Sequence, residues 1–460
     1  MVIFCLYSAL LLALGMLDAR HSQGASAFFV NGRSSGAVHT GFSLAASCIG
    51  GSATIGMAGL AWQVGTPAFW WLGSGACGLA LLTLFIARRV RDTEAYTMPE
   101  IVSAWIGPRA RTLVSLIIMP AWLAILAAQF TAMGKLTVAL TGLPPEWALV
   151  VGAAVIVAYS CLGGQASVIR SDLPQCLLLL AGILVAVFWL LGHNAAPLES
   201  LRVELVNESF GPDRFSYFMI IMGGSYLVCP MLFGRILSAR NSTDAIRGCW
   251  LAVVMLMASA AVIVALGVLC RDFVPAGTSA DDVLSSAMRL LPPWVGMFLL
   301  VALLSAVLSS ADSCLVTAST VLCNDLLGRR NVMLCRLVTL LFGAGGLWLS
   351  FRGHGILDLL LMANDIYVCG VAVPVFAAML MKRGAVHSGA ALVAMAAGGA
   401  GGLASAVSGQ ECFGYAGMAL AVALMLLGRF IRSGSGMLAG TGHNCAVSET
   451  GKAFRIGSCR

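Results

Sequence analysis

Hydroxyl side chains and one carboxylate cluster in the apolar segment 294–322, within the run LLSAVLSSADSCLVTAST. Ser309, Ser310, Asp312 and Ser313 lie within about two helical turns, together with the carbonyl of Ala306. These oxygens are hard donors, which suit a hard cation such as sodium and not zinc or copper. A carboxylate inside an apolar helix is costly without a partner, so the segment predicts a cation site. Alternatively, these small residues only pack helices, with hydroxyls bonded to their own backbone.

Two other apolar segments contain residues that interrupt helices. Gly50 and Gly51 lie in CIGGSATIG, and Gly223, Gly224 and Pro230 lie in MGGSYLVCP. If both segments cross a membrane, unwound carbonyls at matching breaks of two halves can coordinate an ion near the midplane. The alternative is that glycine here only allows membrane helices to pack closely.

The amino-acid composition indicates the class of fold that positions these residues. Of 460 residues, 59% are hydrophobic and only 10% are charged, against roughly 25% charged in a soluble domain. Apolar segments of roughly 17 to 25 residues can cross a bilayer as helices, so we expect an all-α, multi-pass membrane protein with about 13 transmembrane helices. The segments are 2–16, 40–62, 68–87, 113–140, 147–162, 173–191, 215–232, 249–270, 294–322, 332–351, 359–381, 390–406 and 415–430.

Charge alternation predicts the orientation of these segments. Most of the 27 Lys and Arg residues lie in the loops after odd-numbered segments and in the C-terminal tail. By the positive-inside rule, the N-terminus lies outside, the C-terminus lies in the cytoplasm and the number of helices is odd. Segment 2–16 is interpreted as a helix and not a signal peptide, because no basic residue precedes it. The polar tail 431–460 is predicted to be disordered.

Other function classes find little support in the sequence. The 15 cysteines show no metal-ligand spacing and are interpreted as small buried hydrophobes. The net charge of +7 is scattered between apolar segments, so we expect no nucleic-acid partner. The sequence has no HExxH motif and no paired histidines within a predicted helix, so we expect no enzyme. No cofactor is indicated.

Two further acidic residues lie within or at the edge of apolar segments. Asp172 directly precedes the segment 173–191 on the cytoplasmic side. Asp365 enters the segment 359–381 by a few residues from outside, so it could face either an outer vestibule or the site. Ionisable residues inside a membrane are functional candidates by default.

Several motifs in order resemble the sodium:solute symporter family, which includes sodium/proline and sodium/sugar symporters. The motifs are IGMAG at 55–59, YSCLGGQASVIRSDLPQ at 159–175, Pro230 with Arg235, and SAVLSSADS followed by Asp325. The resemblance spans the second to eleventh segments. It implies a five-plus-five inverted-repeat, LeuT-like core, with one repeat at 40–191 and the other at 215–383. Residues 1–39 and 384–430 would then hold accessory helices.

The resemblance also implies site residues. The family's main sodium site falls on the carbonyls of Ala46, Ile49 and Ala306 and on the hydroxyls of Ser309 and Ser310. Asp172 matches an acidic residue implicated in sodium passage and, in some members, in a second sodium site. Asp312 and Ser313 could serve that second site here.

On the substrate side, Tyr226 and Pro230 match the Tyr and Pro at the helix break of the resembled proline symporter. The tyrosine would cap the solute, or it would only anchor helix packing. Met222 and Cys48 replace a Trp and an Asp of that symporter, which puts proline itself in doubt.

These inferences together predict sodium-coupled uptake of a small organic solute across the plasma membrane of a bacterium by alternating access. A carboxylate at Asp365 would suit a solute with an ammonium group, so an amino acid such as proline is favoured over a monocarboxylate or pantothenate. A transporter-like sensor and proton coupling remain alternatives.

Overall fold

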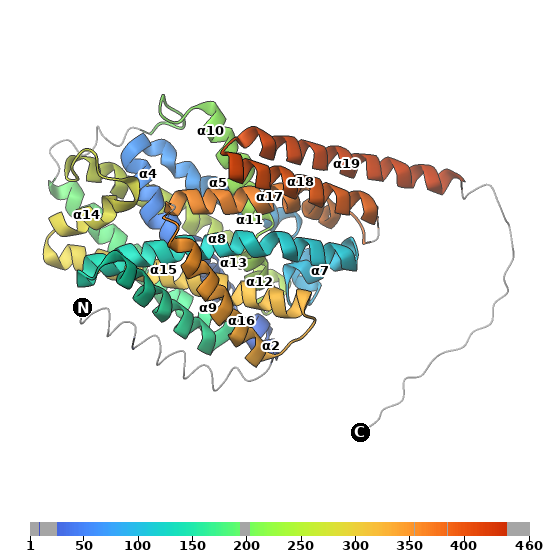
Figure 1. The fold of residues 1–460 in the computed structure, drawn as a ribbon, viewed down its shortest axis with the longest axis horizontal. Helices are drawn as coiled ribbons and strands as arrows, with labels where there is room; N and C mark the ends of the chain where they lie inside the picture. The colour runs from blue at the N-terminus through green and yellow to red at the C-terminus, as the bar shows by residue number, and fades with distance from the viewer. Residues whose placement is uncertain (1–8, 10–24, 194–202, 354, 384, 439–460) are drawn as a thin grey trace, which may run out of the picture.

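The computed structural model describes residues 9, 25–193, 203–353, 355–383 and 385–438, and these residues form a bundle of helices without a β-strand (Figure 1). The expected all-α class is thereby confirmed. The predicted segment 2–16 lies outside the described residues apart from residue 9, as does 439–460 of the predicted tail. The last helix runs past the predicted boundary at 430 and ends at Leu438.

One group of helices in the described residues follows the apolar segments, as whole spans or as the pieces of broken ones. They are α3 (Ala37–Cys48), α4 (Met57–Val64), α5 (Trp70–Phe85), α8 (Pro108–Thr141), α9 (Pro145–His193), α11 (Gly223–Leu227), α12 (Pro230–Ser238), α13 (Ser242–Leu269), α15 (Pro293–Val321), α16 (Val332–Ser350), α17 (Ile356–Leu380), α18 (Ser388–Ser408) and α19 (Glu411–Leu438). Short helices connect them: α2 (Ala25–Val30), α6 (Ala87–Asp92), α7 (Met98–Trp105), α10 (Pro212–Tyr217) and α14 (Val283–Leu290). Tighter or wider turns extend several of these, including η2 (Ser52–Gly56), η4 (Phe218–Met222), η6 (Ala280–Asp282) and η7 (Leu322–Leu326).

Within the described residues, 10 helices are long and apolar enough to cross a membrane, or 11 if a bent pair counts as one span. The bent pair is Ala37–Cys48 with Ser52–Val64. The predicted 13 are therefore not confirmed. Segment 147–162 corresponds to the shorter apolar helix Pro145–Cys161, and segment 2–16 lies outside the described part.

The first predicted break is confirmed between α3 and η2. The backbone leaves the helix at Ile49 (φ −94°, ψ 66°), and the two halves are bent by 65°. A side chain on Gly50 would bring its Cβ to 2.5 Å from Ser310 Oγ, and one on Gly51 would meet Ala132 Cβ at 2.5 Å. Both glycines therefore allow α8 and α15 to approach the broken end of α3.

The second break lies next to Pro230, one of the three residues predicted to interrupt this helix, and not at the two glycines. Gly223 and Gly224 are inside α11, and the backbone leaves the helix only at Val228 (φ −128°, ψ 22°) and Cys229 (φ −69°, ψ 116°). Pro230 then begins α12. The predicted interruption is therefore confirmed at Pro230, since proline disfavours the helical conformation at the preceding residue, and it was wrong at Gly223 and Gly224, which stay helical.

One glycine causes a kink within α9. Helical residues continue through both predicted segments, 147–162 and 173–191, but Gly164 has φ 62° and ψ −165°. This conformation is in practice restricted to glycine, so the chain kinks there. The part that can span a membrane begins at Gly164, which places Asp172 inside the span and not at its start.

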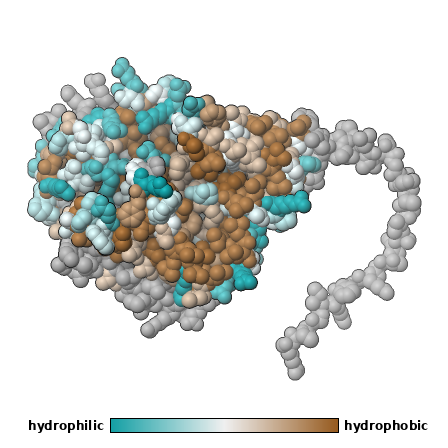
Figure 2. Space-filling model, viewed as in Figure 1, coloured by the Kyte–Doolittle hydropathy of each residue, from teal (hydrophilic) through white to brown (hydrophobic). Residues whose placement is uncertain are grey.

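The surface of the bundle fits a multi-pass membrane protein. Large apolar side chains such as Phe188, Val254, Leu341 and Val407 are exposed. Figure 2 shows apolar side chains over much of one face, while hydrophilic side chains gather at the end that carries α14 in Figure 1. An apolar exterior of this extent is typical of a protein in contact with lipid.

Candidate functional site

Buried oxygens from two helices meet at the broken end of α3. Ser309 Oγ on α15 donates hydrogen bonds to the carbonyls of Ala46 (3.2 Å) and Ala306 (3.1 Å). Ser310 Oγ donates to the carbonyls of Ala46 (3.1 Å) and Ser47 (3.2 Å). The structure thus brings together four of the predicted ligands and adds the Ser47 carbonyl.

The remaining predicted ligand, Ile49, is the residue at which α3 ends. Its side chain is fully buried and its N–H bonds to the carbonyl of Ala45. The serine hydroxyls contact the carbonyls of Ala46 and Ser47 instead. A hydroxyl can rotate to offer its lone pairs, and this donor set of hydroxyls and carbonyls fits a hard cation such as sodium.

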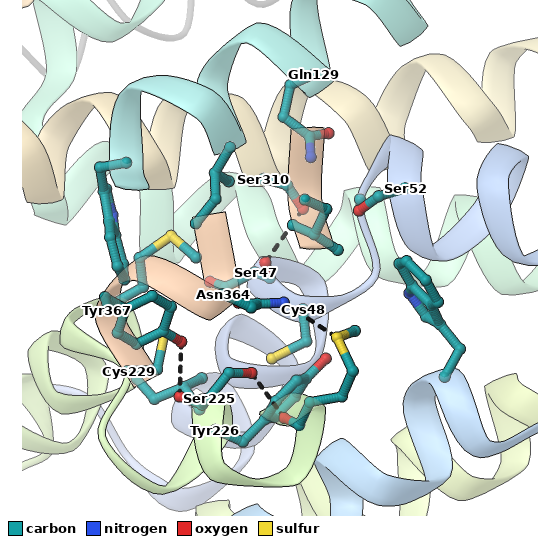
Figure 3. Close-up of a pocket in the computed structure, with 18 residues that line it drawn as sticks. Ser47, Cys48, Ser52, Gln129, Ser225, Tyr226, Cys229, Ser310, Asn364 and Tyr367 are labelled. Carbon is teal, nitrogen blue, oxygen red and sulfur yellow. Dashed lines mark hydrogen bonds between the residues drawn. The ribbon is translucent and has the colours of Figure 1, made fainter. Parts of the chain in front are cut away.

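A cavity of about 70 Å³ lies between the two helix breaks (Figure 3). Ser310 lines this cavity and also belongs to the oxygen cluster described above. Polar lining groups come from Ser47, Ser52, Gln129, Ser225, Tyr226, Asn364 and Tyr367. Apolar and sulfur-containing groups come from Cys48, Trp71, Trp122, Ile125, Met222, Cys229, Met231, Leu232 and Leu360, and Gly50 completes the wall. Among the described residues that line the cavity, none is an acid, a lysine, an arginine or a histidine.

Several lining residues were missed by the sequence interpretation. Gln129 Oε1 accepts a hydrogen bond from the Gly51 N–H (2.8 Å), so it holds the chain in place where η2 begins after the break. Tyr367 donates to the carbonyl of Ser225 (2.9 Å) on α11. A signal did exist for Gln129 and Asn364, because each is a polar amide inside an apolar segment.

Tyr226 lies where the resemblance suggests, in the wall of the cavity near the second break (Figure 3). Its ring also packs against α5: a Cβ at Gly75 would lie 2.5 Å from the ring. Both roles predicted for Tyr226, capping a solute and anchoring a helix, are therefore compatible with its position. Pro230 begins α12 outside the cavity lining, and Gly51 contributes its N–H to Gln129.

Asp365 does not reach the cavity. Its carboxylate accepts hydrogen bonds from the Tyr217 hydroxyl (2.7 Å) and from Ser405 Oγ (3.1 Å). The preceding residue, Asn364, lines the cavity instead. Successive residues of a helix are rotated by about 100°, so one of two neighbours can face the cavity while the other faces α10 and α18.

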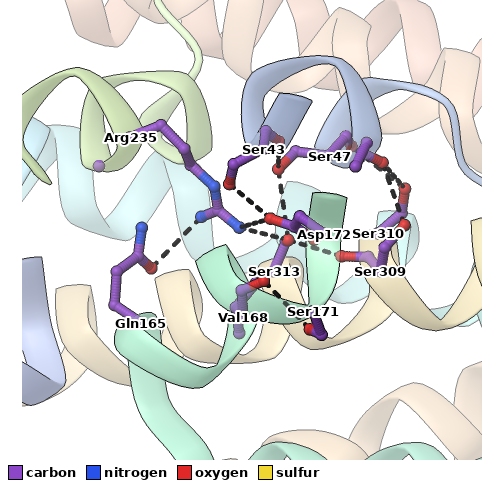
Figure 4. A network of polar contacts seen from close by, with 12 residues as sticks. Ser43, Ser47, Gln165, Val168, Ser171, Asp172, Arg235, Ser309, Ser310 and Ser313 are labelled. Carbon is purple, nitrogen blue, oxygen red and sulfur yellow. Dashed lines mark hydrogen bonds and ion pairs between the residues drawn. The ribbon is translucent and has the colours of Figure 1, made fainter. Parts of the chain in front are cut away.

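A second buried polar cluster lies beside the first (Figure 4). We call Ser43, Asp172, Arg235, Asp312 and Ser313 the inner cluster. Ser43 Oγ donates to Asp172 Oδ2 (2.5 Å), and Arg235 Nη2 lies 3.7 Å from the same oxygen. Arg235 Nη2 also donates to Ser313 Oγ. The side chains of Asp172 and Arg235 are both 0% exposed.

Asp312 belongs to this cluster by position but differs in its bonding. It is fully buried, and neither of its carboxylate oxygens accepts a hydrogen bond from the part of the chain that the structure describes. It interacts electrostatically with Asp172 and Arg235. The structure thus brings the three predicted residues Asp172, Asp312 and Ser313 together and adds Arg235.

An ion-pair network anchors the C-terminal end of α15, where η7 follows. Arg111 at the start of α8 donates to Asp325 Oδ1 in η7 (2.7 Å), and Thr97 donates to the same oxygen (2.9 Å). Arg330 pairs with Glu100 on α7 (3.0 Å). These contacts tie the helix that carries Ser309 to α7 and α8.

Comparison with known proteins identifies the family. The sodium:solute symporter family model matches residues 28–398. The chain belongs to the sodium:solute symporter family. The resemblance noted in the sequence is thus confirmed, and the family is one of multi-pass membrane transporters.

Curated relatives of this family member are distant. It is 26% identical over 305 residues to the sodium/pantothenate symporter of Haemophilus influenzae, covering 62% of this chain and 61% of that protein. It is 25% identical over 351 residues to the sodium/proline symporter of Staphylococcus aureus, covering 70% of this chain and 67% of that protein. The chain therefore spans less than two thirds of the length of the pantothenate relative.

Solved structures share the fold. A sodium-coupled sialic acid symporter in a substrate-bound, outward-open state matches with a TM-score of 0.78 at 16% identity, over 92% of this chain and 96% of that chain. A nucleobase-cation-symport-1 family transporter in a closed conformation matches with a TM-score of 0.58 at 14% identity, over 89% of this chain and 95% of that chain. These likenesses show that the chain shares the fold of the two transporters, which agrees with an all-α membrane protein.

Proposed function

We propose that this chain is a sodium-coupled symporter that imports a small organic solute. One observation carries the proposal. Ser310 reaches the Ala46 carbonyl at the broken end of α3 and also lines the central cavity. An ion bound by these oxygens would therefore lie next to a solute in the cavity. Family membership supports the same activity, and no enzymatic activity is proposed.

The coupling of sodium to solute would follow from the fact that the oxygens of the sodium site belong to two different helices. A sodium ion held by Ala46, Ser309 and Ser310 would join α3 to α15. An ion that binds one conformation more tightly shifts the population towards that conformation. Sodium would favour the outward-open state that binds solute, and its loss to the cytoplasm would release the solute. Because coupling is reciprocal, the solute must also tighten sodium binding.

The cavity favours a solute without net charge. Its lining residues are uncharged, and burying a charge without a partner is costly. A zwitterionic amino acid such as proline fits this condition, with hydrogen bonds available from Gln129, Asn364 and Tyr226. Asp365 lies outside the cavity lining, so its carboxylate gives no reason to favour a solute with an ammonium group. A monocarboxylate or pantothenate is the second candidate, since sodium next to Ser310 could balance a single carboxylate.

The proposed architecture is the five-plus-five inverted repeat, at 40–191 and 215–383, with accessory helices at 1–39 and 384–430. The count of thirteen spans includes segment 2–16 and the helix Pro145–Cys161. The protein is placed in the bacterial inner membrane, with the N-terminus outside and the C-terminus in the cytoplasm. Basic residues between the apolar segments support this orientation.

Uptake into proteoliposomes tests the proposal. The purified full chain is reconstituted with an inward sodium gradient, and unlabelled solutes compete against labelled proline. We expect sodium-dependent uptake and competition by solutes without net charge. Preference for bare anions would contradict the proposed solute class. Uptake driven by a pH gradient without sodium would contradict sodium coupling, and solute binding without flux would indicate a sensor.

A further inference from the structure

A second cavity, of about 440 Å³, lies at the end of the bundle that carries α14 (Figure 1). Its walls come from the C-terminal parts of α8 and α16, the start of α9, η6 and α14. Hydrophilic side chains gather on the surface of this end (Figure 2). In the described part of the chain, no residue lines both this cavity and the central one. A ligand held here would therefore be separate from a solute in the central cavity.

Three charged side chains line this cavity and leave it with an excess of positive charge. Lys135 Nζ lies 2.6 Å from Asp282 Oδ1, so these two charges offset each other. Burial by itself raises the pKa of Asp282, but hydrogen bonds from Lys135 and Ser279 lower it below the ordinary value, so the carboxylate is ionised at neutral pH. Arg289 is exposed, and its side chain makes no ion pair with the residues that the structure describes. Because a guanidinium stays charged, two positive charges and one negative charge give the cavity one net positive charge.

Hydrogen-bonding groups of the cavity are left without partners. An ammonium group has three N–H donors, and Lys135 uses one of them for Asp282. Thr131 Oγ1 lies in the wall, is buried and has no hydrogen-bond partner among the described residues. A buried polar atom without a partner calls for an explanation, such as a water molecule or a ligand. The guanidinium of Arg289 adds a fork of donors that matches the two oxygens of a carboxylate.

The rest of the wall and the size of the cavity favour an organic ligand. Val138, Ala139, Pro145 and Leu149 contribute aliphatic surface. Because roughly 10–15 Å³ suffices for one water molecule, the cavity has room for much more than one inorganic ion. One carboxylate would balance the single net positive charge, whereas a phosphate group carries about −1.5 to −2 charges at neutral pH and would leave an excess of negative charge.

We propose that this cavity binds a small organic monocarboxylate, whose carboxylate contacts Arg289 and Lys135 and whose body contacts the aliphatic wall. The hydroxyl of Thr131 donates its hydrogen to the ligand. A ligand bound in this way joins α8 to α14. Binding does not require sodium, because the oxygens of the proposed sodium site do not line this cavity.

Ligand-observed NMR on the unmodified full chain tests the site. The purified protein in detergent is titrated with lactate in a potassium buffer without sodium, and saturation-transfer difference signals report binding. Lactamide is the matched control ligand, because it has nearly the same shape without the charge. We expect saturable binding of lactate and none of lactamide. Equal binding of the two compounds, or no saturable binding of lactate, would overturn the inference, whereas sodium-dependent proline uptake by the same protein would leave the proposed function intact.

The variant Arg289→Gln tests where lactate binds. It removes a charged contact to the carboxylate, so the Kd for lactate should rise about tenfold. Arg247→Gln is the matched control, because Arg247 is also an exposed arginine but does not line this cavity, and its Kd should be unchanged. Asn364→Ala alters the central cavity and should likewise leave the Kd for lactate unchanged. A Kd that rises in Asn364→Ala but not in Arg289→Gln would place lactate in the central cavity and overturn the inference.

Discussion

Ser310 Oγ lies 3.1 Å from the carbonyl oxygen of Ala46, and this contact joins α15 to the broken end of α3. The same hydroxyl lines the central cavity, so ion site and cavity share a side chain. The two residues are separated by more than half of the chain. Their proximity is the structural basis of the coupling that we propose, because movement of either helix would take the ion site apart.

Ser310→Ala should weaken sodium binding. Removing one hydroxyl that contacts a cation costs about 1.5–3 kcal/mol, so the sodium concentration for half-maximal uptake should rise about tenfold or more. Ser319→Ala is the control, because Ser319 is a buried serine of the same helix whose hydroxyl bonds to the Val316 carbonyl. Unchanged sodium dependence of uptake in both Ser309→Ala and Ser310→Ala would show that sodium does not bind at these two serines.

Gly50→Ala should abolish uptake while the protein is still inserted. The new Cβ would lie 2.5 Å from Ser310 Oγ and 2.9 Å from Gln129 Oε1, so the broken end of α3 would have to move away from α15. Overpacking of this kind typically costs about 1–3 kcal/mol. Gly211→Ala is the control, since a Cβ there meets nothing within 4 Å. Transport rates measured at equal amounts of reconstituted protein compare the two, and normal transport by Gly50→Ala would argue against tight packing at the break.

Neighbouring residues of α17 should have different effects. Asn364→Ala removes a polar group from the cavity, so we expect the KM for solute to rise about fivefold. Asp365→Asn disturbs the hydrogen bonds from Tyr217 and Ser405, so we expect a loss of about 1–2 kcal/mol in stability with the solute KM unchanged. Uptake kinetics and thermal unfolding separate the two effects. A changed solute preference in Asp365→Asn would place that carboxylate at the solute after all.

The contact between Lys135 and Asp282 (2.6 Å) makes stability depend weakly on pH. Burial by itself raises the pKa of Asp282, but hydrogen bonds from Lys135 and Ser279 and the charge of Lys135 outweigh it and lower the pKa below the ordinary value of 3.8. A lowered pKa in the folded protein means that the contribution is complete above about pH 4 and is lost as the pH falls through the folded-state pKa. Both side chains are partly exposed, so the pair contributes at most about 1 kcal/mol.

Asp282→Asn tests this pair. At neutral pH the variant should unfold at a slightly lower temperature than the unmodified protein, and the difference should shrink as the pH falls below 3.8 and the carboxylate of the folded protein becomes protonated. Thermal unfolding in detergent at several pH values measures it. A difference that persists unchanged in acid would mean that Asp282 acts through packing and not through charge.

The sequence determined the features that depend on short stretches of chain. The scarcity of charge indicated a membrane protein, and the serines of SAVLSSADS lie on one helix at spacings that bring Ser309 and Ala306 within hydrogen-bond distance. The double glycine at 50–51 correctly predicted the first break. At the second break the sequence correctly pointed to Pro230 but not to Gly223 and Gly224, because glycine is compatible with a helix and proline is the stronger signal.

Only the tertiary structure decided which side chains meet. The direction of Asp365 depends on the rotation of α17 about its axis, and a segment that is apolar on all sides does not reveal that rotation. The neutral lining of the cavity combines residues from α3, α5, α8, α11, α12, α15 and α17, so it exists only when these helices assemble. The contact of Arg235 with Asp172 and Ser313 likewise joins three distant segments, and composition alone carries no information about such distances.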